Sequence, residues 1–363
     1  MAVAVNQGVL LNEDVIQFLF DNGAKDDISK VTNKGWTPML LVVDEGDIRT
    51  VQWLFEHGAQ ADVRRANNRG MTPMFYACCD QDFELLEWLF DHGAQADVRR
   101  ATNQGCTPMC AACNKDSLEM VLWLFNHGAQ DDVRQATIEG CTPMMIVSKN
   151  NNVKLAQWLF DHGAQDDVRT PDNDGLTPLA MACDWSRFEM VEWLIDHGAH
   201  DDVAISADND CTPMWMACRD GDMRIIQLLH KHAAQEINKK TGRQSTPLQA
   251  LCMNSHCHEN GLEVIQWLIL QGTPSKLTIA SWFNKLENQM RTDLYKQGVK
   301  NRDGEHENYL HFVCNVKHST TLNAFHVLDI DLVLDKIGDF IRGRQETRSL
   351  WYHIVQQGPA VDE

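Results

Sequence analysis

The chain has 363 residues, of which 44% are hydrophobic, and its formal net charge at pH 7 is −19. This length exceeds what a single core usually organises, and the hydrophobic content excludes a disordered chain, so we expect several domains or a repeat array. The acidic charge argues against nucleic acid as a partner, since binding it requires cations that neutralise phosphates, and it favours a basic or mixed-charge protein segment.

The N-terminal segment lacks the basic region that begins a secretory signal. Residues 1–12 contain no Lys or Arg and are followed by Glu13 and Asp14, which argues against a secretory signal. No apolar run reaches the about 18 to 20 residues that a membrane span needs, so we expect a cytoplasmic or otherwise intracellular protein without a membrane partner. Residues 12–24 have the spacing of a helix, with little chain before it for a second one. We therefore predict that residues 1–34 form an N-terminal capping or partial repeat.

Residues 35–272 contain an internal repeat. Thr-Pro pairs are 35 residues apart five times and then 34 residues apart, at 37–38, 72–73, 107–108, 142–143, 177–178, 212–213 and 246–247. Other columns keep the same register, among them Trp53, Trp88, Trp123, Trp158 and Trp193, and His57, His92, His127, His162 and His197. A fixed period of this length is the signature of a repeat architecture.

One unit predicts a helix, a turn, a second helix and a long loop. Thr72 is a suitable N-cap and Pro73 a suitable first helical residue, and residues 74–79 form a short apolar helix. Residues 83–92 place apolar side chains at helical spacing. Gly93 then ends this second helix, because glycine readily adopts the left-handed conformation of a helix C-terminus.

The Gly-x-Thr-Pro opening, the two helices and the Leu-Phe-Asp-His-Gly-Ala ending at 89–94 resemble the ankyrin repeat, over residues 9–272. The resemblance implies an all-α ankyrin-repeat solenoid of stacked helix-turn-helix units with projecting hairpin loops. This chain departs from the family in three ways. Its period is longer, its loop is longer, and it lacks the histidine that usually follows Thr-Pro-Leu. The family's usual role implies a monomeric scaffold or adaptor that binds a partner protein on its concave surface, without catalysis and without a cofactor.

The resemblance also indicates which residues would contact the partner. The loop tips and the ends of the first helices line the concave surface of such a solenoid. Tryptophan and arginine are frequent interface anchors, although each position could equally be ordinary solvated surface. The candidate partner-binding residues are Trp36, Arg69, Met71, Asp80, Lys115, Trp185, Trp215 and Arg219.

Three other columns have structural explanations that we favour. The cysteine ladder, with Cys78 and Cys113 in first helices, is explained by packing of reduced thiols rather than by redox or metal chemistry. The histidine column is explained by hydrogen bonding at helix ends rather than by pH sensing. The aspartates exemplified by Asp97 and the arginines exemplified by Arg99 should form a solvated, mutually screened face; a charged groove that reads a peptide is the alternative.

One cluster contains metal-ligand residue types, at Cys252, His256, Cys257 and His258. Its spacing matches no standard zinc arrangement, so we expect no metal there.

Residues 273–363 carry weaker repeat features, such as Asn308 to Cys314. We predict degenerate ankyrin-like repeats or a helical C-terminal extension there. The alternative function is that the repeats are a targeting arm for a metal-binding or enzymatic C-terminal segment.

Overall fold

The computed structural model describes residues 13–208, 210–241 and 245–253, together with Val264, Trp267, Leu268 and Gln271. The chain divides into two compact units, Met1–Asp208 and Asn209–Glu363. The described residues contain helices and turns but no strand.

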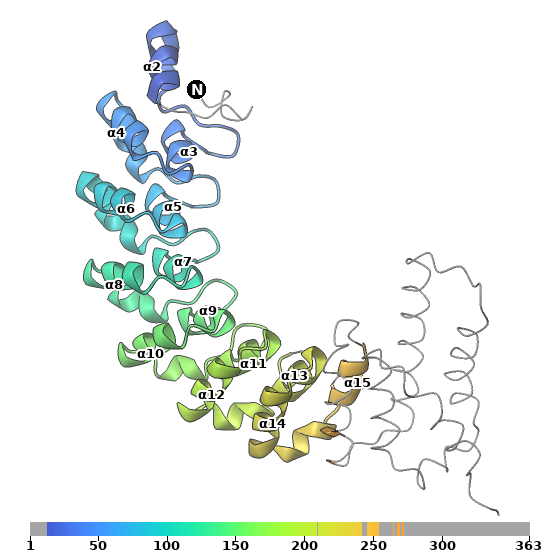
Figure 1. Cartoon of the computed structure of the whole chain (residues 1–363). Helices are drawn as coiled ribbons and strands as arrows, with labels where there is room; N and C mark the ends of the chain where they lie inside the picture. Colours follow the sequence, from blue (N-terminus) through green and yellow to red (C-terminus); the bar gives the residue numbers. More distant parts are fainter. Residues whose placement is uncertain are drawn as a thin grey trace, which may run out of the picture. The chain divides into compact units, whose positions relative to one another are not determined.

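The first unit consists of paired helices that stack in chain order (Figure 1). The first helices of the pairs contact one another in succession and form one layer: α3 (Pro38–Asp44), α5 (Pro73–Asp80), α7 (Pro108–Asn114), α9 (Pro143–Asn150) and α11 (Pro178–Asp184). The second layer contains α2 (Glu13–Leu19), α4 (Ile48–Glu56), α6 (Phe83–Leu89), α8 (Leu118–Asn126), α10 (Val153–Asp161) and α12 (Phe188–Asp196). The long loops project from the side of the first helices (Figure 1).

The helix ends follow the signals in the sequence. The Thr72 hydroxyl accepts a hydrogen bond from the Phe75 amide at 3.2 Å, and Pro73 begins α5. The same threonine cap begins every first helix of this unit. Gly93 has a φ of +110°, a left-handed value that glycine adopts without steric cost. The predicted helix-turn-helix unit is therefore confirmed.

The core lies between the two layers. Fully buried Met39, Met74, Met109 and Met144 come from the first helices, and the second helices contribute the column Leu54, Leu89, Leu124, Leu159 and Leu194. In the tryptophan column Trp53 and Trp193 are buried, whereas Trp123 is half-buried. Its ring stacks on His127 at 3.9 Å and meets the edge of Phe90, from the preceding repeat, at 5.2 Å. The tryptophans thus add an aromatic contact to the interfaces between successive repeats.

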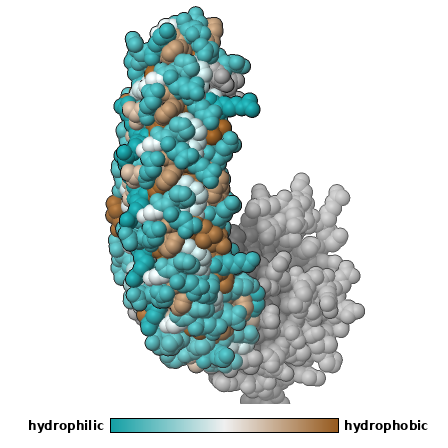
Figure 2. All heavy atoms as spheres, turned by 90° about the vertical axis from the view of Figure 1, so that its left-hand side faces the viewer, coloured by the Kyte–Doolittle hydropathy of each residue, from teal (hydrophilic) through white to brown (hydrophobic). Residues whose placement is uncertain are grey.

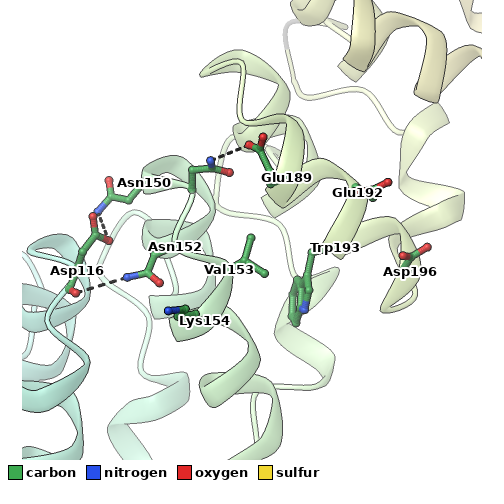
Figure 3. A pocket seen from close by; sticks show the side chains of 10 residues that line it. Asp116, Asn150, Asn152, Val153, Lys154, Glu189, Glu192, Trp193 and Asp196 are labelled. Carbon is green, nitrogen blue, oxygen red and sulfur yellow. Dashed lines mark hydrogen bonds between the residues drawn. The ribbon is translucent and has the colours of Figure 1, made fainter.

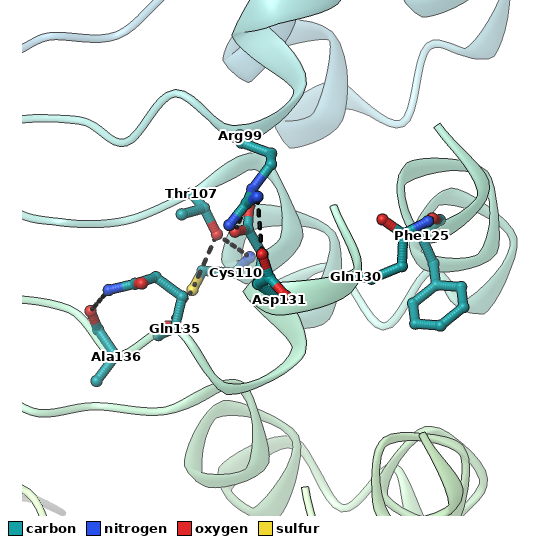
Figure 4. Close-up of polar contacts among 9 residues, drawn as sticks. Arg99, Thr107, Cys110, Phe125, Gln130, Asp131, Gln135 and Ala136 are labelled. Carbon is teal, nitrogen blue, oxygen red and sulfur yellow. Dashed lines mark hydrogen bonds and ion pairs between the residues drawn. The ribbon is translucent and has the colours of Figure 1, made fainter. Parts of the chain in front are cut away.

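The aspartate and arginine columns correct our expectation of a solvated face. The aspartates are buried, with Asp97 at 0% and Asp132 at 2% exposure. From Asp97 onward each pairs with an arginine of the preceding repeat, as when Arg99 Nε donates to Asp132 at 3.0 Å. Arg99 also contacts the exposed Asp131 at 2.9 Å (Figure 4). The sequence pattern was misleading because Asp97, the aspartate nearest to Arg99 in sequence, is not the principal partner of Arg99. The two columns form ion pairs that join neighbouring repeats.

The projecting loops are joined to one another by a second ladder. Each tip closes in a turn, for example with the Asn67 amide donating to Met71 O at 3.0 Å. The backbone amide of Asn103 then donates to the Arg69 carbonyl of the preceding loop at 2.9 Å. The approach is close at Gly70, where a Cβ atom would lie 2.8 Å from the Asn103 nitrogen. This contact explains why glycine precedes the Thr-Pro pair.

The N-terminal helix α2 packs on α4. The Trp53 indole Nε1 donates to Gln17 Oε1 at 2.9 Å, and Phe20 meets the edge of the Trp53 ring at 5.2 Å. The assignment of residues 1–34 as a cap stays a prediction.

The described part of the second unit repeats the same local pattern. It contains α13 (Pro213–Asp220), α14 (Met223–His232), a 3-10 helix at Ala234–Asn238 and α15 (Pro247–Met253). Helix α13 contacts both α14 and α15. Among the helices described in either unit, none has the length and apolar character that would let it span a membrane. Residues 273–363, for which we predict degenerate repeats, lie outside the described residues.

Candidate functional site

Two of the predicted contact residues, Trp36 and Met71, both contact Tyr76 near the loop tips. The Trp36 ring lies 5.2 Å from the Tyr76 ring, and the Tyr76 hydroxyl donates to Met71 Sδ at 3.5 Å. The side-chain amide of Asn67 donates to the same hydroxyl at 3.2 Å. Trp36 and Met71 are both half-buried, so they form a supported apolar surface rather than freely exposed anchors.

Tyr76 is a residue of this surface that sequence reasoning missed. Burial raises the pKa of its hydroxyl to about 12, with a further contribution from the Asp44 carboxylate. The hydroxyl therefore remains protonated and can continue to donate. The signal was weak because Tyr76 lies inside α5 in a run of apolar residues.

Arg69 is exposed at its loop tip. Its backbone is fixed, since its amide donates to Asn67 Oδ1 at 2.9 Å and its carbonyl accepts from the next loop. Within residues 13–208 and the other described segments, its guanidinium forms no ion pair. A rigid backbone and an unpaired cation make Arg69 available to an acidic group.

The ends of the first helices carry charges of both signs. Burial raises the pKa of the Asp44 carboxyl, and the neighbouring Asp80 carboxylate raises it further. Burial also raises the pKa of Asp80, while the Lys115 ammonium acts in the opposite direction. Successive repeats therefore present two acids and then a base along one edge.

Trp185, at the end of α11, is the most exposed tryptophan that the structure describes, with 45% of its surface accessible. The Lys149 ammonium lies 4.4 Å from the centre of its ring, within cation–π distance. This pair continues the row of cations that begins at Lys115.

The two remaining predicted contact residues belong to the second unit. The Trp215 indole Nε1 donates to Ser245 Oγ at 3.3 Å, and the side chain is half-buried. Arg219 is paired with its neighbour Asp220, with Nε donating to Oδ1 at 2.8 Å. Both side chains are held in place by contacts within their own unit.

The histidine column is used in helix-end hydrogen bonds. His127 Nδ1 lies 2.7 Å from the Trp123 carbonyl oxygen, and the other members make the same contact. A carbonyl oxygen can only accept, so Nδ1 is the protonated nitrogen in this contact. This geometry agrees with the helix-end explanation.

The cysteines of the described residues are free thiols. Cys78 and Cys113 are buried in first helices, and burial raises the pKa of both, so they pack as small apolar side chains. Cys110 accepts from the Thr107 hydroxyl at 3.5 Å and donates to the Gln135 carbonyl at 3.7 Å (Figure 4).

No group of three potential ligands arranged for a metal ion occurs within the described part of the chain. In the cluster singled out from the sequence, His256, Cys257 and His258 lie outside the described residues, as does the side chain of Cys252.

Family models of ankyrin repeats match the chain. The model described as "Ankyrin repeats (3 copies)" matches residues 1–100, 61–135 and 109–205, and "Ankyrin repeats (many copies)" matches 214–269. Among solved structures, the crystal structure of the human ASB11 ankyrin repeat domain is similar, with a TM-score of 0.51 and 23% identity. That match covers 66% of this chain and 100% of the other, and it supports the predicted all-α solenoid. No curated protein matches the sequence.

Proposed function

Since the chain belongs to the ankyrin-repeat family, whose repeats are generally protein–protein interaction modules, we propose that it is a scaffold that binds a segment of a partner protein. The binding surface would consist of the loop tips and first helices. The proposal includes no catalytic step and no cofactor, and it places a monomeric protein inside the cell.

The exposed pair Trp185 and Lys149 is the observation that carries this proposal. Trp185 is 45% accessible and so leaves a large aromatic surface in contact with solvent. The ammonium 4.4 Å from the ring restricts how the side chain can move. A rigid aromatic side chain is the kind of residue that provides most of the binding energy in protein interfaces.

The charges suggest the chemistry of the partner. Asp44 and Asp80 would attract a basic group, while Lys115 and Lys149, farther along the same edge, would attract an acidic one. A mixed-charge segment fits this order better than a uniformly charged one. Arg69, Trp36 and Met71 would contact the same partner at the loop tips. We also assign Trp215 and Arg219 to the binding surface of the second unit.

Affinity capture with the full-length chain, followed by mass spectrometry, tests this proposal. We expect Trp185→Ala and Lys115→Glu each to lose proteins that the wild type retains. Leu122→Ala is the matched control, because Leu122 is an exposed apolar residue of α8, in the other layer of helices. Equal retention by the wild type and both variants would show that the first-helix surface is not the binding surface.

A further inference from the structure

A hollow of about 680 Å³ opens on the first unit between α10 and α12. Side chains of the α9–α10 turn, the first turn of α10 and one side of α12 line it, together with Asp116 from the preceding repeat (Figure 3). We call it the α10–α12 groove. It contains none of the candidate contact residues discussed above.

One lining residue of the groove is smaller than its equivalents in the other repeats. Helix α10 begins with Val153, which lines the groove. The equivalent helices of this unit begin with larger side chains, Ile48, Phe83, Leu118 and Phe188. A larger side chain at this position would occupy part of the groove.

The lining is strongly acidic. Helix α12 contributes Glu189, Glu192 and Asp196, which lie three and four residues apart and so share one face of the helix. Asp116 adds a fourth carboxylate, and Lys154 is the one cation of the lining. Like charges at this spacing destabilise a helix unless a cation lies between them.

Two of these carboxylates are held in place and two are available. Asn151 donates to Glu189 Oε2 at 3.0 Å, and Asn150 donates to Asp116 Oδ1 at 3.2 Å. Glu192 and Asp196 are exposed, and neither forms an ion pair with any residue that the structure describes.

We propose that the α10–α12 groove binds the arginine or lysine side chains of an extended basic segment of a partner protein. The carboxylates complement such cations, and a guanidinium can donate two parallel hydrogen bonds to one carboxylate. The volume lies within the range of about 300–1,000 Å³ that is usual for ligand sites. A single metal ion fits less well, because no group of three carboxylates converges on one point among the described residues. The inference does not rest on the function proposed above.

The chain contains its own control for this idea. Glu84 and Glu87 of α6, together with Asp91 two residues beyond its end, occupy the same three repeat positions as the acids of α12. None of the three lines the groove. Neutralising Glu87 and Asp91 therefore changes the net charge equally without touching the groove.

Fluorescence anisotropy of a labelled oligo-arginine peptide with the full-length chain tests the proposal. We expect Glu192→Gln/Asp196→Asn to weaken binding by about tenfold, through the loss of two charge partners. Val153→Phe should weaken it similarly at unchanged net charge, because the ring fills the groove. If the phenylalanine variant does not fold, Val153→Leu is the second variant that fills the groove, since leucine is the residue type that begins α8. Glu87→Gln/Asp91→Asn should bind as the wild type does.

Three results would overturn the proposal. Equal weakening by the two double variants would show that the peptide responds only to net charge. Unchanged binding to a folded Val153 variant would show that the groove is not occupied. Displacement of the peptide by calcium ions, with the ionic strength held constant by adjusting the other salt, would identify a metal site instead. Thermal unfolding of each variant establishes that it is folded.

Discussion

The Arg134 guanidinium donates to the carboxylate of Asp167, which belongs to the next repeat, across 3.0 Å. The Asp167 side chain is 4% exposed, whereas that of Arg134 is 47% exposed. Arg134 also contacts Asp166 at 3.4 Å. One arginine thus compensates a buried charge and joins two repeats.

Replacing Arg134 with alanine should destabilise the first unit. The change leaves the Asp167 carboxylate buried without its cation, and a buried charged acceptor that loses its partner costs about 1–3 kcal/mol. Urea unfolding monitored by circular dichroism measures this loss. Arg49→Ala is the control, since Arg49 is exposed on α4 and forms no ion pair within the described segments. A loss no larger than that of the control would mean that solvent replaces the guanidinium.

Asp62, at the start of the same column, should make stability depend on pH. Burial raises the pKa of its carboxyl above the ordinary value of 3.8, although Ser29 and Arg65 act in the opposite direction. The folded state therefore binds the proton more tightly than the unfolded state does. Ionised Asp62 costs stability above its folded pKa, and this cost disappears as the pH falls through that pKa toward 3.8.

The Asp62→Asn variant tests this sign, because asparagine is neutral at every pH. Relative to the wild type, this variant should be more stable near pH 7 than it is near pH 4. Denaturant titrations across this range measure the difference, with the exposed carboxylate variant Glu56→Gln as the control. A difference that does not change with pH would contradict the role given to burial.

The repeat units could be predicted from the sequence, while the contacts between units could not. Thr72 and Gly93 mark helix ends through local chemistry, and local chemistry is readable from one stretch of chain. The pairing of Arg99 with Asp132 depends on how two repeats stack, and the sequence places Asp97 nearer to Arg99 than Asp132. Tyr76 was missed for the same reason, since its contact with Trp36 joins adjacent repeats.

The aromatic contacts between repeats should contribute a measurable coupling energy. Phe90 meets the Trp123 ring edge-on, with centroids 5.2 Å apart and planes at 85°. Such pairs contribute about 0.5–1.5 kcal/mol beyond area burial. A double-mutant cycle with Phe90→Leu and Trp123→Leu should yield a coupling in this range. The corresponding cycle of Phe90 with Trp158, two repeats away, should yield none. Equal values would show that the cycle reports general loosening rather than contact.

The position and charge of the α10–α12 groove also exceed what the sequence predicts. The acids of α12 are visible in the sequence, but Glu84, Glu87 and Asp91 occupy the same repeat positions and do not line this groove. The groove also needs Asp116 and the α9–α10 turn, and their position beside α12 depends on the packing of helices that belong to different repeats. A pattern of charges alone therefore could not locate this site.

The asparagine ladder of the loops is interrupted at Ile138. The side-chain amides of Asn68, Asn103 and Asn173 donate to backbone carbonyls of the preceding loop at 3.0, 2.9 and 2.8 Å. At the equivalent position Ile138 cannot donate, and its side chain is 63% exposed. Within the loops that the structure describes, the Asn103 carbonyl accepts no such amide.

Ile138→Asn should therefore stabilise the first unit, against the usual direction of point substitutions. The new amide can donate to the Asn103 carbonyl as its equivalents do, and one such hydrogen bond contributes about 0.5–1.5 kcal/mol. The substitution also removes an exposed apolar side chain without opening a cavity. Asn173→Ala should have the opposite effect, because it removes the bond to the Ile138 carbonyl. Thermal unfolding of the two variants measures both signs, and an unchanged or lower midpoint for Ile138→Asn would show that the ladder bonds contribute nothing net against water.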